Sequence, residues 1–293
     1  MIANEVHAEG EARLQQCCMI AIKAVRAAAV THVSSRQQLA SPCSDGERTT
    51  VATRADLEAR SLATFLISRA AQTLPTAVYS ETSVVTIDES GAIVSTIANG
   101  HEDDGTWRRP VHDSYWLVDG LDGVVSFRRG LPFFSATVAY VEHVEVQVGA
   151  TYAAATDELF TVIRGGAPRL NGIPVRASGR EQTRGAMVCS GNELRFHPQR
   201  PEGLLLRNFG SHALSLAYVA CGRIDAYVSV PTRPSHLGAW DCAAGSLLVT
   251  AAGGSCLGPA GSPSDIWAGG MVAASSASLA KTLSEVVAFP GGR

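Results

Sequence analysis

Apolar residues recur at helical spacing near the N-terminus of the chain. The spacing predicts helices over Ala12–His32 and Thr53–Ala71, and a polar segment containing Pro42 and Gly46 separates them. Pro75 ends the second helix. We expect this second helix to bury one apolar face, which would consist of Leu57, Leu62, Phe65 and Leu66.

Shorter alternating segments predict a sheet in the next part of the chain. Thr76–Tyr79 is expected to form a strand, and Val84–Ile97 a hairpin that turns at Glu89-Ser90-Gly91. A polar loop over His101–His112 leads to the apolar run Tyr115–Val118. An antiparallel meander is then predicted over Phe133–Val141, Glu145–Tyr152 and Glu158–Ile163.

The second half of the chain alternates strand and helix patterns. Strands are expected at Ala186–Ser190, Ile224–Val230 and Met271–Ala274. Helices are expected at Ser211–Cys221, Asp241–Ala252 and Leu279–Val287. Together the patterns predict a mixed α and β protein with helices layered on two sheets.

Composition narrows the function classes. Of the 293 residues 46% are hydrophobic and 17% are charged, with a net charge of −3, which excludes disorder and argues against nucleic-acid binding driven by charge. The apolar stretch Cys17–Val30 is interrupted by Lys23 and Arg26 and is shorter than a membrane span of roughly 20 residues. The N-terminus is polar and acidic, unlike a signal peptide, and the seven cysteines form no CxxC motif. We therefore expect a cytoplasmic protein with reduced thiols and no membrane partner.

The segment Asp119-Gly120-Leu121-Asp122-Gly123 directly follows the apolar run. Two carboxylates three residues apart at the end of a strand can converge on one hard cation, and the backbone amides of Gly123 and Val124 can face a phosphate. On its own the segment fits an ordinary Asp-Gly turn equally well.

Three further carboxylates are candidates for the same site. Asp241 follows Trp240 at the start of an apolar helix, where it could instead be a simple N-cap. Glu81 follows a strand, and there a solvated surface position is the alternative. Asp56 lies near the start of the predicted second helix, where it could merely complement the helix dipole.

Taken in order, these motifs resemble those of the inositol monophosphatase family, within the superfamily of lithium-sensitive sugar phosphatases. The segments that carry the resemblance are Tyr79–Thr82, Trp116–Phe127, Gly210–Leu214, Gly222–Tyr227, Trp240–Gly245 and Ala251–Gly254. The resemblance covers about Ala12 to the C-terminus. It implies an α+β fold, the layered αβαβα sandwich of the inositol monophosphatase and fructose-1,6-bisphosphatase type. Residues 1–293 would form one domain, with an N-terminal α+β half of about 1–180 and a C-terminal α/β half of about 181–293.

The resemblance also implies the metal ligands. Glu81, Asp119 and the carbonyl of Leu121 would hold a first Mg²⁺, and Asp119, Asp122 and Asp241 would hold a second. A third, weaker ion would lie near Glu81 and water. Metal-activated water would then attack the phosphorus of a small phosphorylated substrate.

Other roles follow from the same resemblance. Asp56 would orient or deprotonate the water, and the amides of Gly123 and Val124 would bind the phosphate. Asp56, Glu81 and Val124 are thus the expected catalytic positions. Substrate contacts are expected from Gly210, Ser211, His212 and Ser229.

The sequence departs from the family pattern at several of these positions. Val124 replaces a threonine whose hydroxyl would help Asp56 to position the water, and losing such positioning costs on the order of 10²-fold in rate. Gly120 replaces a proline, which predicts a looser loop. Ser80 and Thr82 replace the glycine and the second glutamate of a Gly-Glu-Glu segment, which weakens the surroundings of the first metal.

The sequence therefore predicts a Mg²⁺-dependent phosphomonoesterase that acts on a small sugar, polyol or nucleotide-like phosphate. Ser229 replaces an acidic residue of the inositol phosphatases, and Pro231–Gly238 resembles an insertion that shapes the substrate pocket. A 3'(2'),5'-bisphosphate nucleotidase-like enzyme is therefore an alternative, as is a catalytically altered member that binds or transfers phosphate. We also expect a homodimer and no nucleic-acid partner.

Overall fold

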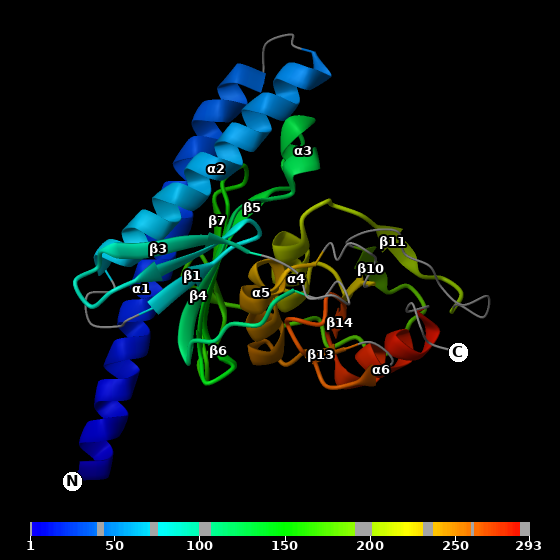
Figure 1. Cartoon of the computed structure of the whole chain (residues 1–293). Coiled ribbons are helices and arrows are strands. Elements are labelled where there is room, and N and C mark those ends of the chain that lie inside the picture. The colour runs from blue at the N-terminus through cyan, green and yellow to red at the C-terminus, as the bar shows by residue number, and fades with distance from the viewer. Residues whose placement is uncertain are drawn as a thin grey trace.

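Helices and sheets stack in five alternating layers, α-β-α-β-α (Figure 1). The structure is a computed structural model that describes residues 2–39, 44–70, 76–99, 107–190, 201–230, 237–258 and 261–287. Two long helices form the first layer, a nine-stranded sheet the second, two helices the third, a five-stranded sheet the fourth and one helix the last. The layered sandwich expected from the sequence is confirmed.

The first layer consists of α1 (Ile2–Leu39) and α2 (Asp45–Ala70), which pack along each other and on the first sheet. Both helices are longer than predicted. A capping box starts α2 eight residues before the expected position, because the Ser44 amide donates to Glu47 Oε2 at 2.7 Å while the Glu47 amide donates to Ser44 Oγ at 3.3 Å. This Ser-x-x-Glu signal, Ser44 to Glu47, lies in the polar segment that we expected to separate the two helices.

The predicted apolar face of α2 is wrong. Leu57 is 51% exposed and Phe65 is 55% exposed. The buried face instead carries mostly small residues: Ala52, Ala55, Ala59, Arg60, Ala63, Thr64, Ile67 and Ser68. Small side chains let the α2 backbone approach the sheet and α1 closely, which larger leucine and phenylalanine side chains would prevent.

The nine-stranded sheet has the order β3-β2-β1-β4-β5-β6-β7-β8-β9. Its strands are β1 (Thr76–Tyr79), β2 (Ser83–Ile87), β3 (Ile93–Ala98), β4 (Ser114–Asp122), β5 (Ser135–Glu142), β6 (Glu145–Ala153), β7 (Glu158–Ile163), β8 (Arg169–Leu170) and β9 (Ile173–Pro174). Strands β1 and β4 pair in parallel, and the other described pairs of this sheet are antiparallel. The β2–β3 hairpin and the β5–β6–β7 meander are therefore confirmed. The register of β4 against β5 shifts between Asp119 and Asp122.

The five-stranded sheet has the order β11-β10-β12-β14-β13. Its strands are β10 (Met187–Ser190), β11 (Leu205–Arg207), β12 (Ala226–Ser229), β13 (Ser255–Leu257) and β14 (Met271–Ala274). The three-residue strands β11 and β13 were not predicted, because so short a segment carries no readable alternation. Helix α6 (Ala277–Val286) packs on β13 and β14 and forms the last layer.

The central layer holds α4 (His212–Ala220) and α5 (Ala239–Ala251), and the largest buried apolar cluster surrounds it. Glycines bring these helices close to their neighbours. A Cβ on Gly245 would lie 2.4 Å from Leu216 Cβ, and one on Gly149 would lie 2.8 Å from Ala244 Cα. Close packing fixes α5 against both α4 and β6, and α5 is the helix that carries Asp241.

Helix α1 is the one described helix that is long and apolar enough to cross a membrane, over Ala8–Leu39. Length and composition alone give this result, and 56% of its most apolar window is buried inside the fold. The window packs on α2 and on the first sheet, so core packing accounts for its apolar character.

Candidate active site

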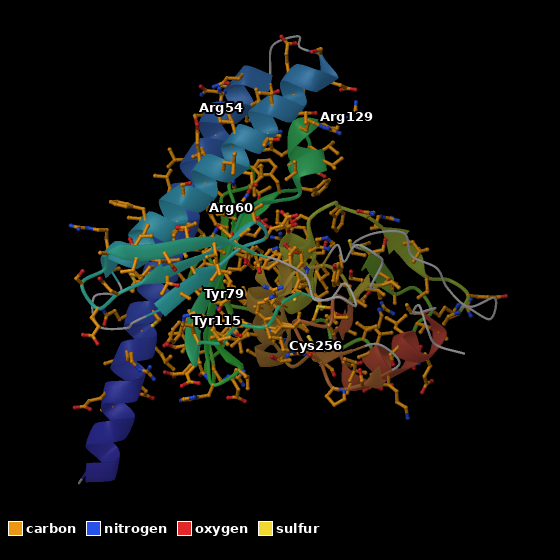
Figure 2. All side chains as sticks on the ribbon, viewed as in Figure 1. Arg54, Arg60, Tyr79, Tyr115, Arg129 and Cys256 are labelled. Atoms are coloured by element: carbon orange, nitrogen blue, oxygen red, sulfur yellow. The ribbon has the colours of Figure 1, made fainter. Side chains whose placement is uncertain are left out.

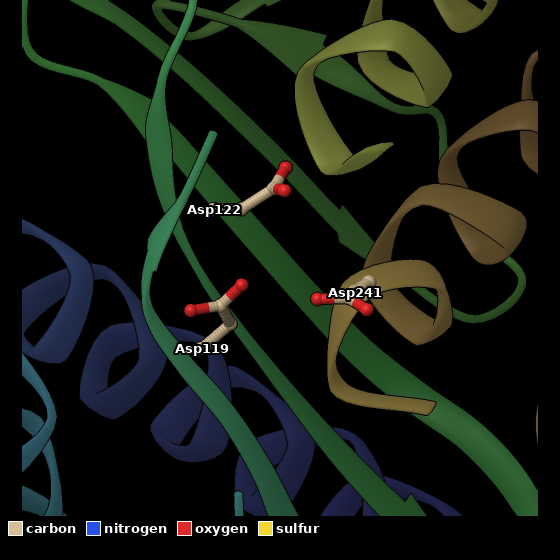
Figure 3. A group of neighbouring side chains, drawn as sticks. All are labelled: Asp119, Asp122 and Asp241. Atoms are coloured by element: carbon tan, nitrogen blue, oxygen red, sulfur yellow. The ribbon is translucent and has the colours of Figure 1, made fainter. Parts of the chain in front are cut away.

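Three carboxylates meet where β4 ends and α5 begins. Asp119 and Asp122 come from β4 and Asp241 from the first turn of α5, and each offers an oxygen within 4.8 Å of the others. Figure 3 shows the three side chains directed into the same space between strand and helix. The register shift in β4 lets two aspartates three residues apart reach one side of the sheet.

Asp122 is held by the N-terminus of α4. Ser211 Oγ donates to Asp122 Oδ2 at 2.5 Å, and the Ala213 amide donates to the same oxygen at 2.8 Å. Ser211 also caps α4, since its Oγ accepts from the Leu214 amide at 3.2 Å. Ser211 thus orients the Asp122 carboxylate and caps α4 at the same time.

Asp241 is not the N-cap of its helix. Helix α5 begins at Ala239 after Gly238, and the Gly238 amide donates to Asp241 Oδ2 at 2.7 Å. A Cβ on Gly238 would lie 2.1 Å from the indole ring of Trp240, so the turn that presents Asp241 leaves room only for glycine. The sequence placed the start of this helix two residues too late.

The three carboxylates repel one another. Burial and the neighbouring carboxylates raise the pKa of Asp119 and of Asp241 well above the usual range. Asp119 accepts a hydrogen bond from the Leu121 amide at 2.9 Å, which orients its carboxylate. A buried set of hard oxygen ligands in which like charges crowd together is suited to Mg²⁺, so the residues fit the metal that the sequence led us to expect.

The carboxylates lie in a cavity of about 210 Å³ that gathers most of the predicted site residues. The cavity is lined by Asp56, Glu81, Trp107, Asp119, Leu121, Asp122, Gly123, Val124, Val125, Gly210, His212, Gly238, Trp240 and Asp241. Gly123 has a left-handed backbone (φ 92°) and precedes α3 (Val124–Arg128), so Val124 begins this short helix at the cavity wall.

Two predicted substrate contacts are not among the lining residues. Ser211 donates to Asp122, as described above. Ser229 is fully buried on β12, so the structure does not bring its side chain to the cavity. Glu81 lines the cavity but is not part of the close group that Asp119, Asp122 and Asp241 form. Of the four carboxylates that we expected in one site, three therefore form a close group, and Glu81 lies elsewhere on the wall of the same cavity.

Asp56 has a partner that the sequence analysis missed. The Arg60 side chain, labelled in Figure 2, is only 8% exposed. It forms an ion pair with Asp56 one helical turn earlier and also donates to Thr82 Oγ1. Burial raises the pKa of Asp56, while the positive charge of Arg60 lowers it. The i,i+4 spacing of aspartate and arginine on one helix was the signal available in the sequence.

Aromatic residues border the cavity. Trp107 and Trp240 meet edge to face with ring centroids 4.5 Å apart, and His212 Nδ1 lies 2.5 Å from the hydroxyl of the buried Tyr227. Neither tryptophan was predicted as a site residue. The polar loop before Trp107 and residues 231–236 of the predicted insertion lie outside the described residues.

Comparison with known proteins places these motifs in a family. A sequence model described as the inositol monophosphatase family matches residues 13–289. Nus factor SuhB of Pasteurella multocida is 32% identical over 196 residues, which cover 63% of this chain and 72% of that protein. The inositol-1-monophosphatase of Rhizobium meliloti is 35% identical over 188 residues, covering 60% of this chain and 68% of that protein.

Other relatives are covered less completely. Nus factor SuhB of Haemophilus influenzae is 35% identical over 153 residues, and the chain spans 55% of that protein. Solved structures of the SuhB protein from Bartonella henselae and of an inositol monophosphatase from Anabaena share the fold, each with a TM-score of 0.69 and 23% identity. These structures cover 90% and 93% of the present chain.

Proposed function

Because this chain belongs to the inositol monophosphatase family, we propose that it is a Mg²⁺-dependent phosphomonoesterase for a small sugar, polyol or nucleotide-like phosphate. The observation that supports this most strongly is the meeting of Asp119, Asp122 and Asp241 within 4.8 Å in one cavity. Two of them come from a strand and one from a helix more than a hundred residues later, and the approach of their charges needs a compensating cation.

The residues of the chain have separate tasks in this proposal. Asp119, Asp122 and Asp241 would hold Mg²⁺, with Glu81 and the Leu121 carbonyl as further ligands from the cavity wall. Bound Mg²⁺ would supply Lewis-acid stabilisation of the phosphate and a more acidic water. The amides of Gly123 and Val124, at the start of α3, would donate to phosphate oxygens, since the first amides of a helix have no acceptor within it.

Asp56 would orient the water that attacks phosphorus. It lines the same cavity as the three aspartates, and burial raises its pKa, which suits a group that accepts a proton during the reaction. Val124 offers no hydroxyl to assist it. Hydrolysis would therefore be slower than with a threonine at this position.

The cavity indicates the substrate class. A volume of about 210 Å³ bordered by carboxylates, His212 and two tryptophans accommodates a compact polar group attached to phosphate. His212 and Gly210 are our proposed substrate contacts, and a 3'(2'),5'-bisphosphate nucleotide is the alternative substrate because Ser229 and the segment Pro231–Gly238 differ from the inositol pattern.

A second candidate is a binding role with little turnover. Val124 and Thr82 favour it, because both lack polar groups of the family pattern. Several of the relatives are named Nus factor SuhB, and this name describes those proteins and not the present chain. The homodimer, the cytoplasmic location and the absence of a nucleic-acid partner stay predictions.

A phosphate-release screen would separate the two candidates. The purified chain is incubated with sugar, polyol and nucleotide phosphates, with Mg²⁺ or with EDTA, and inorganic phosphate is measured. The proposal expects release from at least one small substrate that EDTA abolishes and added Mg²⁺ restores. Phosphate release that persists in EDTA, or none at saturating Mg²⁺ across the panel, would contradict it.

A further inference from the structure

Arg60 contacts Asp56, one of the carboxylates that line the cavity. It pairs with Asp56 and donates to Thr82 Oγ1, and it is not among the described residues that line the cavity. An arginine stays charged when buried, and its burial is unfavourable unless good geometry and hydrogen bonds compensate for the lost hydration. The position of Arg60 therefore indicates a task beyond filling space.

Resting on the phosphatase function proposed above, we propose that Arg60 positions Asp56 toward the attacking water, in place of the hydroxyl that Val124 lacks. Arg60 Nη2 holds Asp56 Oδ2, so the carboxylate cannot rotate about its Cβ–Cγ bond without breaking the ion pair. Asp56 Oδ1 is then kept in one place relative to the cavity. Arg60 acts through Asp56 and is a positioning residue.

The second contact of Arg60 links α2 to the short segment between β1 and β2. Thr82 directly follows Glu81, which lines the cavity. One planar guanidinium thus contacts both the carboxylate of Asp56 and the hydroxyl of Thr82, the residue after Glu81. A lysine ammonium on a single flexible stem cannot reproduce this forked contact.

The backbone of Arg60 is also part of the arrangement. A Cβ on Gly120 would lie 2.6 Å from the Arg60 amide nitrogen and 2.9 Å from the Asp56 carbonyl oxygen. The turn of α2 from Asp56 to Arg60 is therefore pressed against the β4 segment that carries Asp119 and Asp122. Arg60 therefore contacts three segments of the site: its backbone packs on the β4 segment, and its side chain contacts Asp56 and Thr82.

The charges agree with this role. Five carboxylates line the cavity, and Arg60 is ion-paired with the one that is not expected to bind metal. The positive charge of Arg60 favours the ionised form of Asp56, and the ion pair orients this carboxylate. A hydroxyl at position 124, which lines the same cavity as Asp56, would orient the same carboxylate. Arg60 and a hydroxyl at position 124 would be alternative ways to orient Asp56, so each should affect kcat more when the other is absent.

The test compares Arg60→Met, Arg60→Lys and Arg60→Met combined with Val124→Thr, at saturating Mg²⁺ on the best substrate of the screen. The matched control is Arg54→Met on the same helix, because the Arg54 side chain is half exposed and lies 3.9 Å from Glu58. We expect Arg60→Met to lower kcat by at least about tenfold with KM within about twofold of the parent, and Arg60→Lys to fall between them. Adding Val124→Thr should restore at least about threefold of the lost kcat.

Thr82→Val covers the case in which Arg60→Met does not fold. It removes the acceptor of one Arg60 contact without leaving a charge unpaired, and we expect a loss of about threefold in kcat at unchanged KM. An active parent whose folded Arg60→Met or Thr82→Val keeps its full kcat overturns the positioning role alone. A loss of kcat in Arg60→Met that Val124→Thr does not relieve overturns it as well. A parent without Mg²⁺-dependent phosphate release overturns the proposed function first.

Discussion

His32 Nε2 lies 2.7 Å from the carbonyl oxygen of Gly120, so the first helix holds the loop between the two β4 aspartates. A carbonyl only accepts, which means that Nε2 carries a hydrogen and donates it. His32 is fully buried, and its Nδ1 has no hydrogen-bond partner among the described atoms. Burial lowers the pKa of His32 to about 4.

This relationship predicts acid sensitivity. The pKa of His32 is lower in the folded chain than in the unfolded chain, so the neutral ring stabilises the fold above about pH 6.5. That contribution is lost as the pH falls toward about 4. Between pH 7 and pH 5 we expect a loss of about 2 kcal/mol in the free energy of unfolding. Denaturant titrations of the parent and of His32→Gln, which removes the titrating ring, measure it.

The control for this prediction is the exposed His143. His143→Asn suits the left-handed backbone at that position (φ 48°) and should keep the pH dependence of the parent. A His32→Gln variant that loses as much stability as the parent between pH 7 and pH 5 would assign the acid sensitivity to other groups.

Gly120 gives a second prediction, and here the structure changes the interpretation of the sequence. We expected glycine in place of proline to loosen the loop, but Gly120 packs so closely on α2 that a Cβ would lie 2.6 Å from the Arg60 amide nitrogen. Gly120→Ala should therefore lower the free energy of unfolding by about 1–3 kcal/mol and also lower activity.

The matched control is Gly10→Ala on α1, where a Cβ meets nothing within 4 Å. Alanine is the better helix former, so this variant should be neutral or more stable by up to about 1 kcal/mol. Thermal unfolding and phosphate release are measured for both. Equal behaviour of the two alanine variants would show that the β4 loop moves freely away from α2.

Much of the fold was readable from local pattern. The β5–β6–β7 meander followed from the approximate alternation of apolar and polar residues, and the motifs around Asp119 and Asp241 indicated the site because the order of the residues along the chain is specific. The buried face of α2 was not readable, since its apolar stripe of Leu57, Leu62 and Phe65 points outward while alanines pack inside. Burial there is decided by how closely two backbones approach, which hydrophobicity alone does not encode.

The site shows the same limit. The sequence indicated which carboxylates gather but not what holds them, because supporting contacts such as Ser211 to Asp122 or Arg60 to Thr82 join residues far apart in the chain. Ser229 was expected in the site because it stands where the inositol phosphatases carry an acidic residue, yet its side chain is fully buried at the end of β12. Which face of a strand a residue occupies depends on a register that a four-residue strand does not reveal.

The support of Asp122 provides a third prediction. Ser211→Ala removes both the cap of α4 and the 2.5 Å hydrogen bond to Asp122 Oδ2, so it should destabilise the fold by about 1 kcal/mol and weaken Mg²⁺ binding. Calorimetric titration with Mg²⁺ measures the affinity, and thermal unfolding measures the stability.

The control is Ser276→Ala, because Ser276 caps α6 in the same way, accepting from the Leu279 amide at 3.1 Å, on the outer layer of the fold. It should cost similar stability and leave Mg²⁺ affinity unchanged. If the two serine variants lose the same amount of Mg²⁺ affinity, Ser211 acts on stability alone.

Asp119 supplies the fourth prediction. Asp119→Asn removes one of three crowded carboxylates, so in EDTA at pH 7 the variant should be at least as stable as the parent, while Mg²⁺-dependent phosphate release should vanish. Asp113→Asn, at the exposed start of the same strand region, is the control and should keep parent activity. Near-normal turnover in Asp119→Asn would remove this residue from the metal site.

The fifth prediction concerns Val124, which is 39% exposed and shares the cavity with Asp56. Val124→Thr keeps the volume nearly constant and adds one hydroxyl that can contact the water or Asp56, so its cost in stability should be small. Since Arg60 already restrains Asp56, we expect a rise in kcat of up to about tenfold, about 1.4 kcal/mol of barrier. Val94→Thr, on the exposed strand β3, controls for the substitution itself and should leave kcat unchanged. A fast parent phosphatase that gains nothing from Val124→Thr would show that the water is positioned without help from this side of the cavity. A parent and a variant that both release negligible phosphate would instead favour the binding role, because then the missing hydroxyl is not what limits hydrolysis.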